Sequence, residues 1–201
     1  MEIIIGDEEI DKLCQNSNIK KIKVCLLGID NSGKSTFIQR ITSINNFNNF
    51  KKSIDKIIFT TGANYHKLLV KFKGELFQLD LWNTSRQIKA LTKFFYRDAD
   101  VILNFYNPFN EDSFEYIKKF FQSVNESNDK FHFTYILIKN KYDLNETKDK
   151  NIMISDEEIL EYAEENNLTV KYLSSLEKYD CGLEEIIEDC INGYLHKNNK
   201  S

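Results

Sequence analysis

One stretch near the start of the chain restricts its fold more than any other: residues 21–36, KIKVCLLGIDNSGKST. An apolar run over Val24–Leu27 stops at Gly28, and a second glycine, Gly33, precedes a Lys-Ser-Thr triplet. The residues that follow, FIQRIT, are compatible with a helix. The sequence therefore predicts a buried strand, a tight turn and a helix start in direct succession.

The spacing of the two glycines and the lysine is that of a phosphate-binding loop. Glycines allow backbone N–H groups to curl around phosphate oxygens, and the N-terminus of the following helix adds its partial positive charge. Lys34 is expected to reach the β- and γ-phosphates, and Ser35 to offer its hydroxyl to Mg²⁺. The loop residues that we expect to contact a nucleotide are Asp30, Asn31, Ser32, Gly33, Lys34, Ser35 and Thr36.

Length, charge and cysteine content narrow the class of protein. A chain of 201 residues favours a single domain. Its net charge of −4 argues against nucleic acid or an anionic membrane as an electrostatic partner. The four cysteines show no metal-type spacing, and no apolar run approaches membrane-spanning length. We therefore expect a cytoplasmic protein with free thiols.

Strand-like apolar runs alternate with helix-like periodic segments along the chain, apart from one hairpin signal at Lys73–Gly74. This alternation predicts an α/β fold: a mostly parallel six-stranded sheet with one antiparallel edge hairpin strand and helices on both faces. The sequence also predicts an N-terminal extension over residues 1–19, one domain over 20–196 and a short C-terminal tail over 197–201.

Two helix starts carry a capping-box pattern. Asp112 is followed three residues later by Glu115, and Ser155 is followed in the same way by Glu158. We therefore expect Asp112 and Ser155 to cap helices.

The segment after the apolar run Phe133–Ile138 adds a preference for one base. It contains Asn140, Lys141 and Asp143. An aspartate there accepts hydrogen bonds from the N1–H and the exocyclic amine of guanine, whereas adenine lacks this donor pair and leaves the carboxylate unpaired. Asn140 is expected to bond the base edge and brace the loop, and the stem of Lys141 to lie along the purine face. The sequence therefore favours guanine nucleotides.

With both loops in place, the chain resembles the Ras superfamily of small GTPases over residues 20–195, and the Rab family most closely. Thr60-x-Gly62, the hairpin at Gly74 and Trp82 fall at Rab spacings, and NFYNPFNEDSFEYIKKFF is similar to the Rab segment after the fourth strand. The resemblance implies the small G-domain fold of phosphate-loop NTPases, binding of GTP and GDP with Mg²⁺, and GTP hydrolysis.

The resemblance also implies roles for residues outside the two loops. Thr60 corresponds to the switch threonine that closes on Mg²⁺ and the γ-phosphate. Gln87 takes the position of the catalytic glutamine, where it either orients the attacking water together with Lys34 or is an ordinary surface residue at a loop–helix junction. Phe47 is the candidate for an aromatic contact to the base. Three residues, with leucine in place of a lysine, occupy the position of the guanine-loop Ser-Ala-Lys: Ser174, Ser175 and Leu176.

The Asp-x-x-Gly-Gln motif of the family is altered here, because the aligned residues read NTSRQ from Asn83 to Gln87. A register with Asp80 as the aspartate is rejected, since Asp80 falls on the polar face of its strand. Asn83 lacks the charge that holds a Mg²⁺-bound water, and Arg86 replaces a glycine whose N–H engages the γ-phosphate. Asp30, in a loop closer to the Arf type, adds negative charge. We expect slower hydrolysis with binding retained.

Two functions of different classes remain open. The first is an atypical Rab-like GTPase that hydrolyses GTP slowly and regulates vesicle transport or signalling through protein effectors. The second is a guanine-nucleotide-binding interaction module that does not cycle. A phosphate-loop ATPase or kinase is disfavoured by Asp143.

The end of the chain also differs from the Rab pattern. Rabs usually end in a flexible segment with prenylated cysteines, whereas this chain ends HKNNKS, and Cys190 lies on the apolar face of the last expected helix. Either the protein has no lipid anchor, or the sequence is a fragment of something longer. We expect a cytoplasmic protein that reaches endomembranes through partners.

Overall fold

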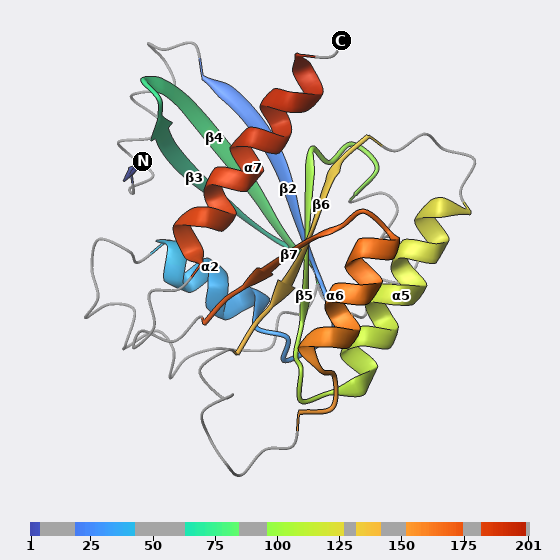
Figure 1. Ribbon diagram of the computed structural model, residues 1–201. Helices are drawn as coiled ribbons and strands as arrows, with labels where there is room; N and C mark the ends of the chain where they lie inside the picture. Colours follow the sequence, from blue (N-terminus) through green and yellow to red (C-terminus); the bar gives the residue numbers. More distant parts are fainter. Residues whose placement is uncertain are drawn as a thin grey trace.

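The computed structural model (Figure 1) describes residues 1–4, 19–42, 63–84, 96–126, 132–141, 152–174 and 182–199. These residues form a seven-stranded sheet in the order β1-β3-β4-β2-β5-β6-β7. The strands are β1 (Glu2–Ile4), β2 (Lys20–Leu27), β3 (Ala63–Phe72), β4 (Glu75–Thr84), β5 (Val101–Tyr106), β6 (Thr134–Lys139) and β7 (Thr169–Tyr172). The helices are α2 (Lys34–Thr42), α5 (Glu111–Asn125), α6 (Asp156–Glu165) and α7 (Leu183–Asn198).

The parallel part of the sheet is built from the most apolar runs of the chain. β2 pairs in parallel with both β4 and β5, β5 pairs with β6, and β6 pairs with β7. Every residue of β5 and five of the six residues of β6 are buried, as parallel strands covered on both faces require. The carboxyl ends of these strands meet at one edge, which is where such sheets bind ligands.

The antiparallel part of the sheet starts from the β3–β4 hairpin. Lys73 and Gly74 have φ angles of 50° and 83°, and positive φ at both central residues is the requirement of a type I′ turn. On the outer side of β3, β1 adds a short antiparallel strand with Glu2–Ile4 opposite Leu69–Lys71. The predicted six strands and the α/β class are confirmed, and the first residues of the predicted extension add a seventh strand.

Helices cover both faces of the sheet, with α2 and α7 on one face and α5 and α6 on the other (Figure 1). Alternate residues of β2 contribute to the two cores. Val24 packs in the core with Phe37 of α2 and Ile187 of α7. Leu27 belongs to the opposite core, together with Phe114 of α5. β2 is buried on both faces from Val24 to Leu27, so a site can form where this buried part ends, at the carboxyl end of the strand.

The two predicted capping boxes have different outcomes. Oγ of Ser155 accepts a hydrogen bond from the backbone N–H of Glu158 at 3.1 Å, so the capping bond predicted at α6 is confirmed. Helix α5 begins at Glu111, and the side chain of the preceding Asn110 makes no capping bond. Asp112 already lies inside the first turn of α5, so the capping role predicted for it is wrong.

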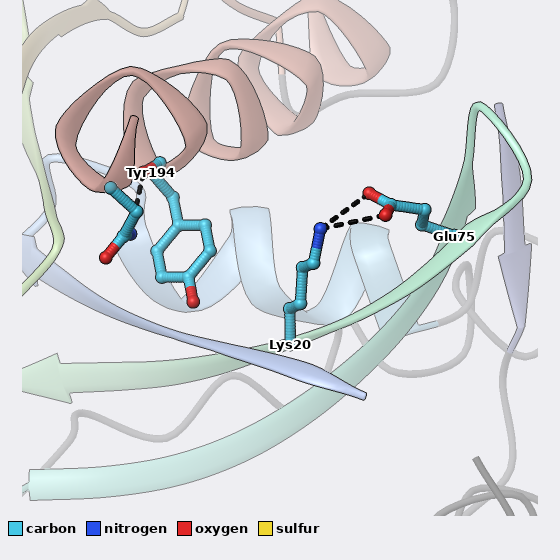
Figure 2. Close-up of polar contacts among 4 residues, drawn as sticks. Lys20, Glu75 and Tyr194 are labelled. Atoms are coloured by element: carbon cyan, nitrogen blue, oxygen red, sulfur yellow. Dashed lines mark hydrogen bonds and ion pairs between the residues drawn. The ribbon is translucent and has the colours of Figure 1, made fainter. Parts of the chain in front are cut away.

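Ion pairs join the amino ends of the strands to their neighbours. Lys20 at the start of β2 bonds both carboxylate oxygens of Glu75 at the start of β4, at 2.9 and 2.8 Å (Figure 2). Nζ of Lys197 lies 2.9 Å from Oδ1 of Asp100, just before β5. Because Lys197 belongs to α7, this helix extends into the tail predicted to begin there.

Candidate functional site

The loop between β2 and α2 is shaped by two glycines that no larger residue can replace without a shift. A Cβ at Gly28 (φ 134°) would lie 2.3 Å from the backbone oxygen of Phe105. A Cβ at Gly33 (φ 98°) would lie 1.8 Å from Nδ2 of Asn140. These close approaches keep the loop narrow, and the backbone N–H of Phe37 bonds Gly33 O at 2.9 Å as α2 begins. The predicted succession of a buried strand, a tight turn and a helix start is therefore present.

The side chain of Lys34 folds back over this loop. Its Nζ donates hydrogen bonds to the backbone oxygens of Gly28, at 2.7 Å, and Ile29, at 2.9 Å, and it lies 3.3 Å from Oγ of Ser32. Burial lowers the pKa of Lys34 to about 8, and the carboxylate of Asp30 partly offsets this effect. A buried ammonium group at the N-terminus of α2 is a favourable position for an anion.

Asn83, near the carboxyl end of β4, reaches the start of α2. Its Nδ2 donates a hydrogen bond to Oγ of Ser35 at 3.1 Å, and Asn83 is buried. The parallel pairing of β4 with β2 sets this contact, because Asn83 is the register partner of Leu26, close to the loop. The structure therefore brings together the residue predicted as a metal ligand and the residue that aligns with the family's metal-site aspartate.

The loop after β6 is bonded directly to the phosphate loop. Nδ2 of Asn140 donates to the backbone oxygen of Ser32 at 2.8 Å, and both residues are buried. The backbone N–H of Asn140 bonds Tyr106 O at 3.1 Å, which fixes where this loop leaves the sheet. Asn140 therefore joins the loop after β6 to the loop before α2, and its contact to the base stays a prediction.

The described site residues lie at the carboxyl ends of β2, β6 and β7. Asp30 and Asn31 are exposed at the tip of the first loop, whereas Ser32 and Lys34 are buried in it. Lys141 follows Asn140, and the buried Ser174 follows β7. Gly33, Ser35 and Thr36 are half-buried where the loop enters α2. Six predicted site residues lie outside the described part of the chain: Phe47, Thr60, Gln87, Asp143, Ser175 and Leu176.

Sequence reasoning missed one buried charge beside this site. The side chain of Lys139, the last residue of β6, is only 1% exposed and forms an ion pair with Asp156 at the start of α6. The available signal was a lysine at the end of the otherwise apolar run TYILIK.

Comparison with known proteins supplies the family. The sequence model of the Ras family matches residues 23–195. The chain belongs to the Ras family. A Ras-related protein Rab-21 of Geodia cydonium is 29% identical over 181 residues, which is 89% of this chain and 72% of that protein. Ras-related protein RABA5b of Arabidopsis thaliana is 28% identical over 179 residues, or 87% of this chain and 77% of that protein.

A shorter match has slightly higher identity. Ras-related protein SEC4 of Saccharomyces cerevisiae is 31% identical over 126 residues, which is 61% of this chain and 54% of that protein. This Ras-family small GTPase is therefore a distant homologue of Rab proteins. Family membership identifies it as a GTP-binding protein and implies GTP hydrolysis with Mg²⁺. Within the described ranges, no helix has the length and apolar character needed to cross a membrane.

Proposed function

We propose that this protein is an atypical Rab-like GTPase that binds GTP and GDP with Mg²⁺ and hydrolyses GTP slowly. The contact that carries the proposal joins Nδ2 of Asn83 to Oγ of Ser35 at 3.1 Å. It places a neutral amide where the family motif has a carboxylate. Nucleotide binding keeps its anchors in Lys34 and Asn140, whereas the part of the site nearest the metal and the γ-phosphate is weakened.

The residues beside Asn83 fit a metal ion that arrives with the nucleotide. Mg²⁺ prefers oxygen ligands and is usually held by one or two protein groups together with substrate phosphates. Oγ of Ser35 is such a ligand at the start of α2, and Thr60 is proposed as the second. When bound, Mg²⁺ neutralises charge on the β- and γ-phosphates. Because Asn83 is uncharged, it attracts the ion less than an aspartate would.

Guanine is proposed to be recognised at the other end of the site. Asp143 accepts from the N1–H and the amine of the base, and the stem of Lys141 lies along the purine. The bond from Asn140 to Ser32 O supports this placement, because it holds the start of the base-recognition loop against the phosphate loop. Further contacts to the base are proposed for Phe47, Ser174, Ser175 and Leu176.

Slow hydrolysis is proposed from the residues around the γ-phosphate. Lys34 stabilises developing charge, and Gln87 orients the attacking water. Arg86 stands where the family has a glycine, and the exposed Asp30 adds negative charge to the tip of the phosphate loop. Phosphoryl transfer depends on positioning and on charge stabilisation, so both changes raise the barrier.

The first experiment loads the purified protein with GTP and Mg²⁺, removes the excess and follows the bound nucleotide by chromatography over hours. Conversion to GDP supports a slow switch. GTP that stays intact contradicts hydrolysis and favours the second candidate function, a guanine-nucleotide-binding interaction module that does not cycle. The uncharged Asn83 beside Ser35 favours that candidate.

A second experiment measures GTP hydrolysis by the double variant Asn83→Asp/Arg86→Gly. This variant is expected to hydrolyse GTP faster than the wild type. An unchanged rate would show that these two residues do not limit hydrolysis.

Base recognition has a test of its own. Xanthine carries a carbonyl group where guanine carries the exocyclic amine, so an amide in place of the carboxylate complements it. Asp143→Asn is expected to weaken binding of GDP and to gain binding of xanthosine diphosphate. Unchanged GDP affinity in this variant would remove Asp143 from the site.

The cellular role is proposed from the Rab relatives. Vesicle transport or signalling through protein effectors is the role that this similarity supports, with a cytoplasmic protein that reaches endomembranes through those partners. The test is to compare the proteins retained by the GTP-loaded and the GDP-loaded protein. If the GTP-loaded and the GDP-loaded protein retained the same proteins, a switch that binds effectors in only one nucleotide state would be contradicted.

A further inference from the structure

Lys139 occupies an unusual position for a charged residue. It pairs in register with Tyr106 of β5 on one side and Tyr172 of β7 on the other, so the three side chains share one face of the sheet. Its side chain is 1% exposed, and its Nζ lies 5.6 Å from the centroid of the Tyr172 ring. A lysine is rarely buried to this extent unless its charge has a partner.

The partner is Asp156, the first residue of α6. Nζ of Lys139 forms an ion pair and hydrogen bond with Oδ1 of Asp156, whose side chain is 43% exposed. The N-terminus of α6, capped by Ser155, adds a second source of positive potential for this carboxylate. The ion pair therefore joins the end of β6 to the start of α6.

The position of this ion pair in the sequence links it to the nucleotide site. Lys139 and Asp156 flank residues 140–155, the segment that contains Asn140, Lys141 and Asp143. Where the segment leaves the sheet, the backbone oxygen of Lys139 accepts from Leu173 N at 2.8 Å. The two residues that flank this segment, Lys139 and Asp156, are therefore joined to each other by an ion pair.

The return of the segment is also bonded in place. The backbone N–H groups of Met153 and Ile154 both donate to the backbone oxygen of Pro108, at 2.9 and 3.2 Å. Ile154 is buried against the core below α5 and α6. Main-chain bonds hold the first end of the segment to Leu173, just after β7, and the second end to Pro108, just after β5. The Lys139–Asp156 pair is a side-chain bond that connects one end to the other.

We propose that Lys139 is a positioning residue for base recognition, because its ion pair with Asp156 fixes the two described ends of the segment whose sequence contains Asn140 and Asp143. This inference rests on the proposed guanine-nucleotide function. It predicts a defined defect. Loosening the pair affects contacts to the base, and in particular the discrimination between guanine and a base that lacks one of its hydrogen-bond donors. Lys34 keeps its own bonds to Gly28 O and Ile29 O in such a variant, so its contacts to the phosphates are expected to change less than base discrimination does.

The test variant is Lys139→Met. Methionine keeps an unbranched stem of similar length in the buried position, so the variant removes the charge without opening a large cavity. The Asp156 carboxylate that remains is partly exposed and can be hydrated. The matched control is Lys197→Met, which cuts the ion pair with Asp100 at the opposite ends of the strands. Asp156→Glu is the conservative variant, because it keeps the charge at a partly exposed position.

The measurements are the GDP dissociation rate and the ratio of affinities for GDP and inosine diphosphate, which lacks the exocyclic amine. Lys139→Met is expected to release GDP about tenfold faster and to lose most of the preference for GDP over inosine diphosphate. Lys197→Met is expected to leave both values unchanged, and Asp156→Glu to stay close to the wild type. If Lys139→Met weakens both nucleotides in equal proportion, or matches the Lys197 control, the positioning role is overturned.

A separate measurement distinguishes this failure from failure of the proposed function. The wild-type protein is first compared for binding of GDP and ADP. A wild type without a preference for GDP contradicts guanine recognition itself, and with it this inference. A wild type that prefers GDP, with a Lys139→Met variant that keeps its discrimination, overturns the role of Lys139 alone.

Discussion

Gly33 and Asn140 lie so close together that a Cβ on the glycine would stand 1.8 Å from Nδ2 of the asparagine. The same Nδ2 donates to Ser32 O at 2.8 Å, so Asn140 can move aside only by breaking that bond. The phosphate loop and the base-recognition loop therefore touch at a point where only glycine fits. This contact makes the shape of one loop depend on the position of the other.

Gly33→Ala is accordingly expected to weaken GDP binding at least about a hundredfold, because a small displacement of both loops affects phosphate and base contacts together. The measurement is equilibrium binding of a fluorescent GDP analogue. The control is Gly74→Ala, at φ 83° with no atom within 4 Å of the added Cβ. It is expected to cost about 1–2 kcal/mol of backbone strain and to leave affinity unchanged. If Gly33→Ala bound GDP with wild-type affinity, the side chain of Asn140 could move away from the added Cβ at little cost.

Asn83→Asp is expected to make retention of GDP depend more strongly on Mg²⁺. A carboxylate beside Oγ of Ser35 adds a negative charge near the metal, so about tenfold less free Mg²⁺ should be needed to slow GDP release by half. The measurement is the GDP dissociation rate across a series of Mg²⁺ buffers. Asn125→Asp, which adds the same charge at an exposed position in α5, is the control. If the wild type and Asn83→Asp showed the same dependence of GDP dissociation on Mg²⁺, residue 83 would have no influence on metal binding.

Two buried tyrosines are expected to respond in opposite ways to loss of their hydroxyl groups. The hydroxyl of Tyr106 has no hydrogen-bond partner among the described residues, whereas that of Tyr135 accepts from Nδ2 of Asn104 at 2.7 Å. Tyr106→Phe should raise the free energy of unfolding by up to about 1 kcal/mol, and Tyr135→Phe should lower it by about 1–2 kcal/mol. Urea unfolding at a fixed GDP concentration measures both. Equal losses would show that Tyr106 has a partner elsewhere in the chain.

The two helix starts give a further comparison. Ser155→Ala removes the bond from Glu158 N to Oγ, so it should lower the free energy of unfolding by about 1 kcal/mol. Asp112→Ala removes only a favourable charge from the first turn of α5, and the expected loss is below about 0.5 kcal/mol. Thermal unfolding of both variants with GDP bound tests the difference. If Asp112→Ala lowered the free energy of unfolding more than Ser155→Ala, Asp112 would cap α5 after all, as the sequence pattern predicts.

The parts of the fold that could be predicted from the sequence are those fixed by local chemistry. Continuous apolar runs predict β5 and β6, and Lys73–Gly74 predicts the hairpin, because burial and turn geometry leave their signature within a few residues. The phosphate loop belongs to the same class, since Gly28 and Gly33 are needed for their φ angles and close approaches. The bonds of Lys34 to the backbone oxygens of that loop were not predicted, and its contacts to the phosphates stay a prediction.

The parts that could not be predicted depend on partners far away in the sequence. β1 is three residues long and pairs with Leu69–Lys71, so its own sequence shows no period. The burial of Lys139 depends on Asp156, which becomes a neighbour only when α6 packs against the sheet. The cap predicted at Asp112 fails because α5 starts earlier, at Glu111, and the short pattern does not fix where the chain turns into the helix.

The pairing of β1 with β3 has a practical consequence for anyone who shortens this chain. Starting the protein at Lys20 would keep every described residue of the candidate site but would uncover the backbone of Leu69–Lys71 along the outer side of β3. An uncovered strand edge is a template on which a second molecule can add its own strand. The shortened protein is therefore the better material for asking whether two copies associate through this edge, and the longer one is the better choice for crystals of the monomer.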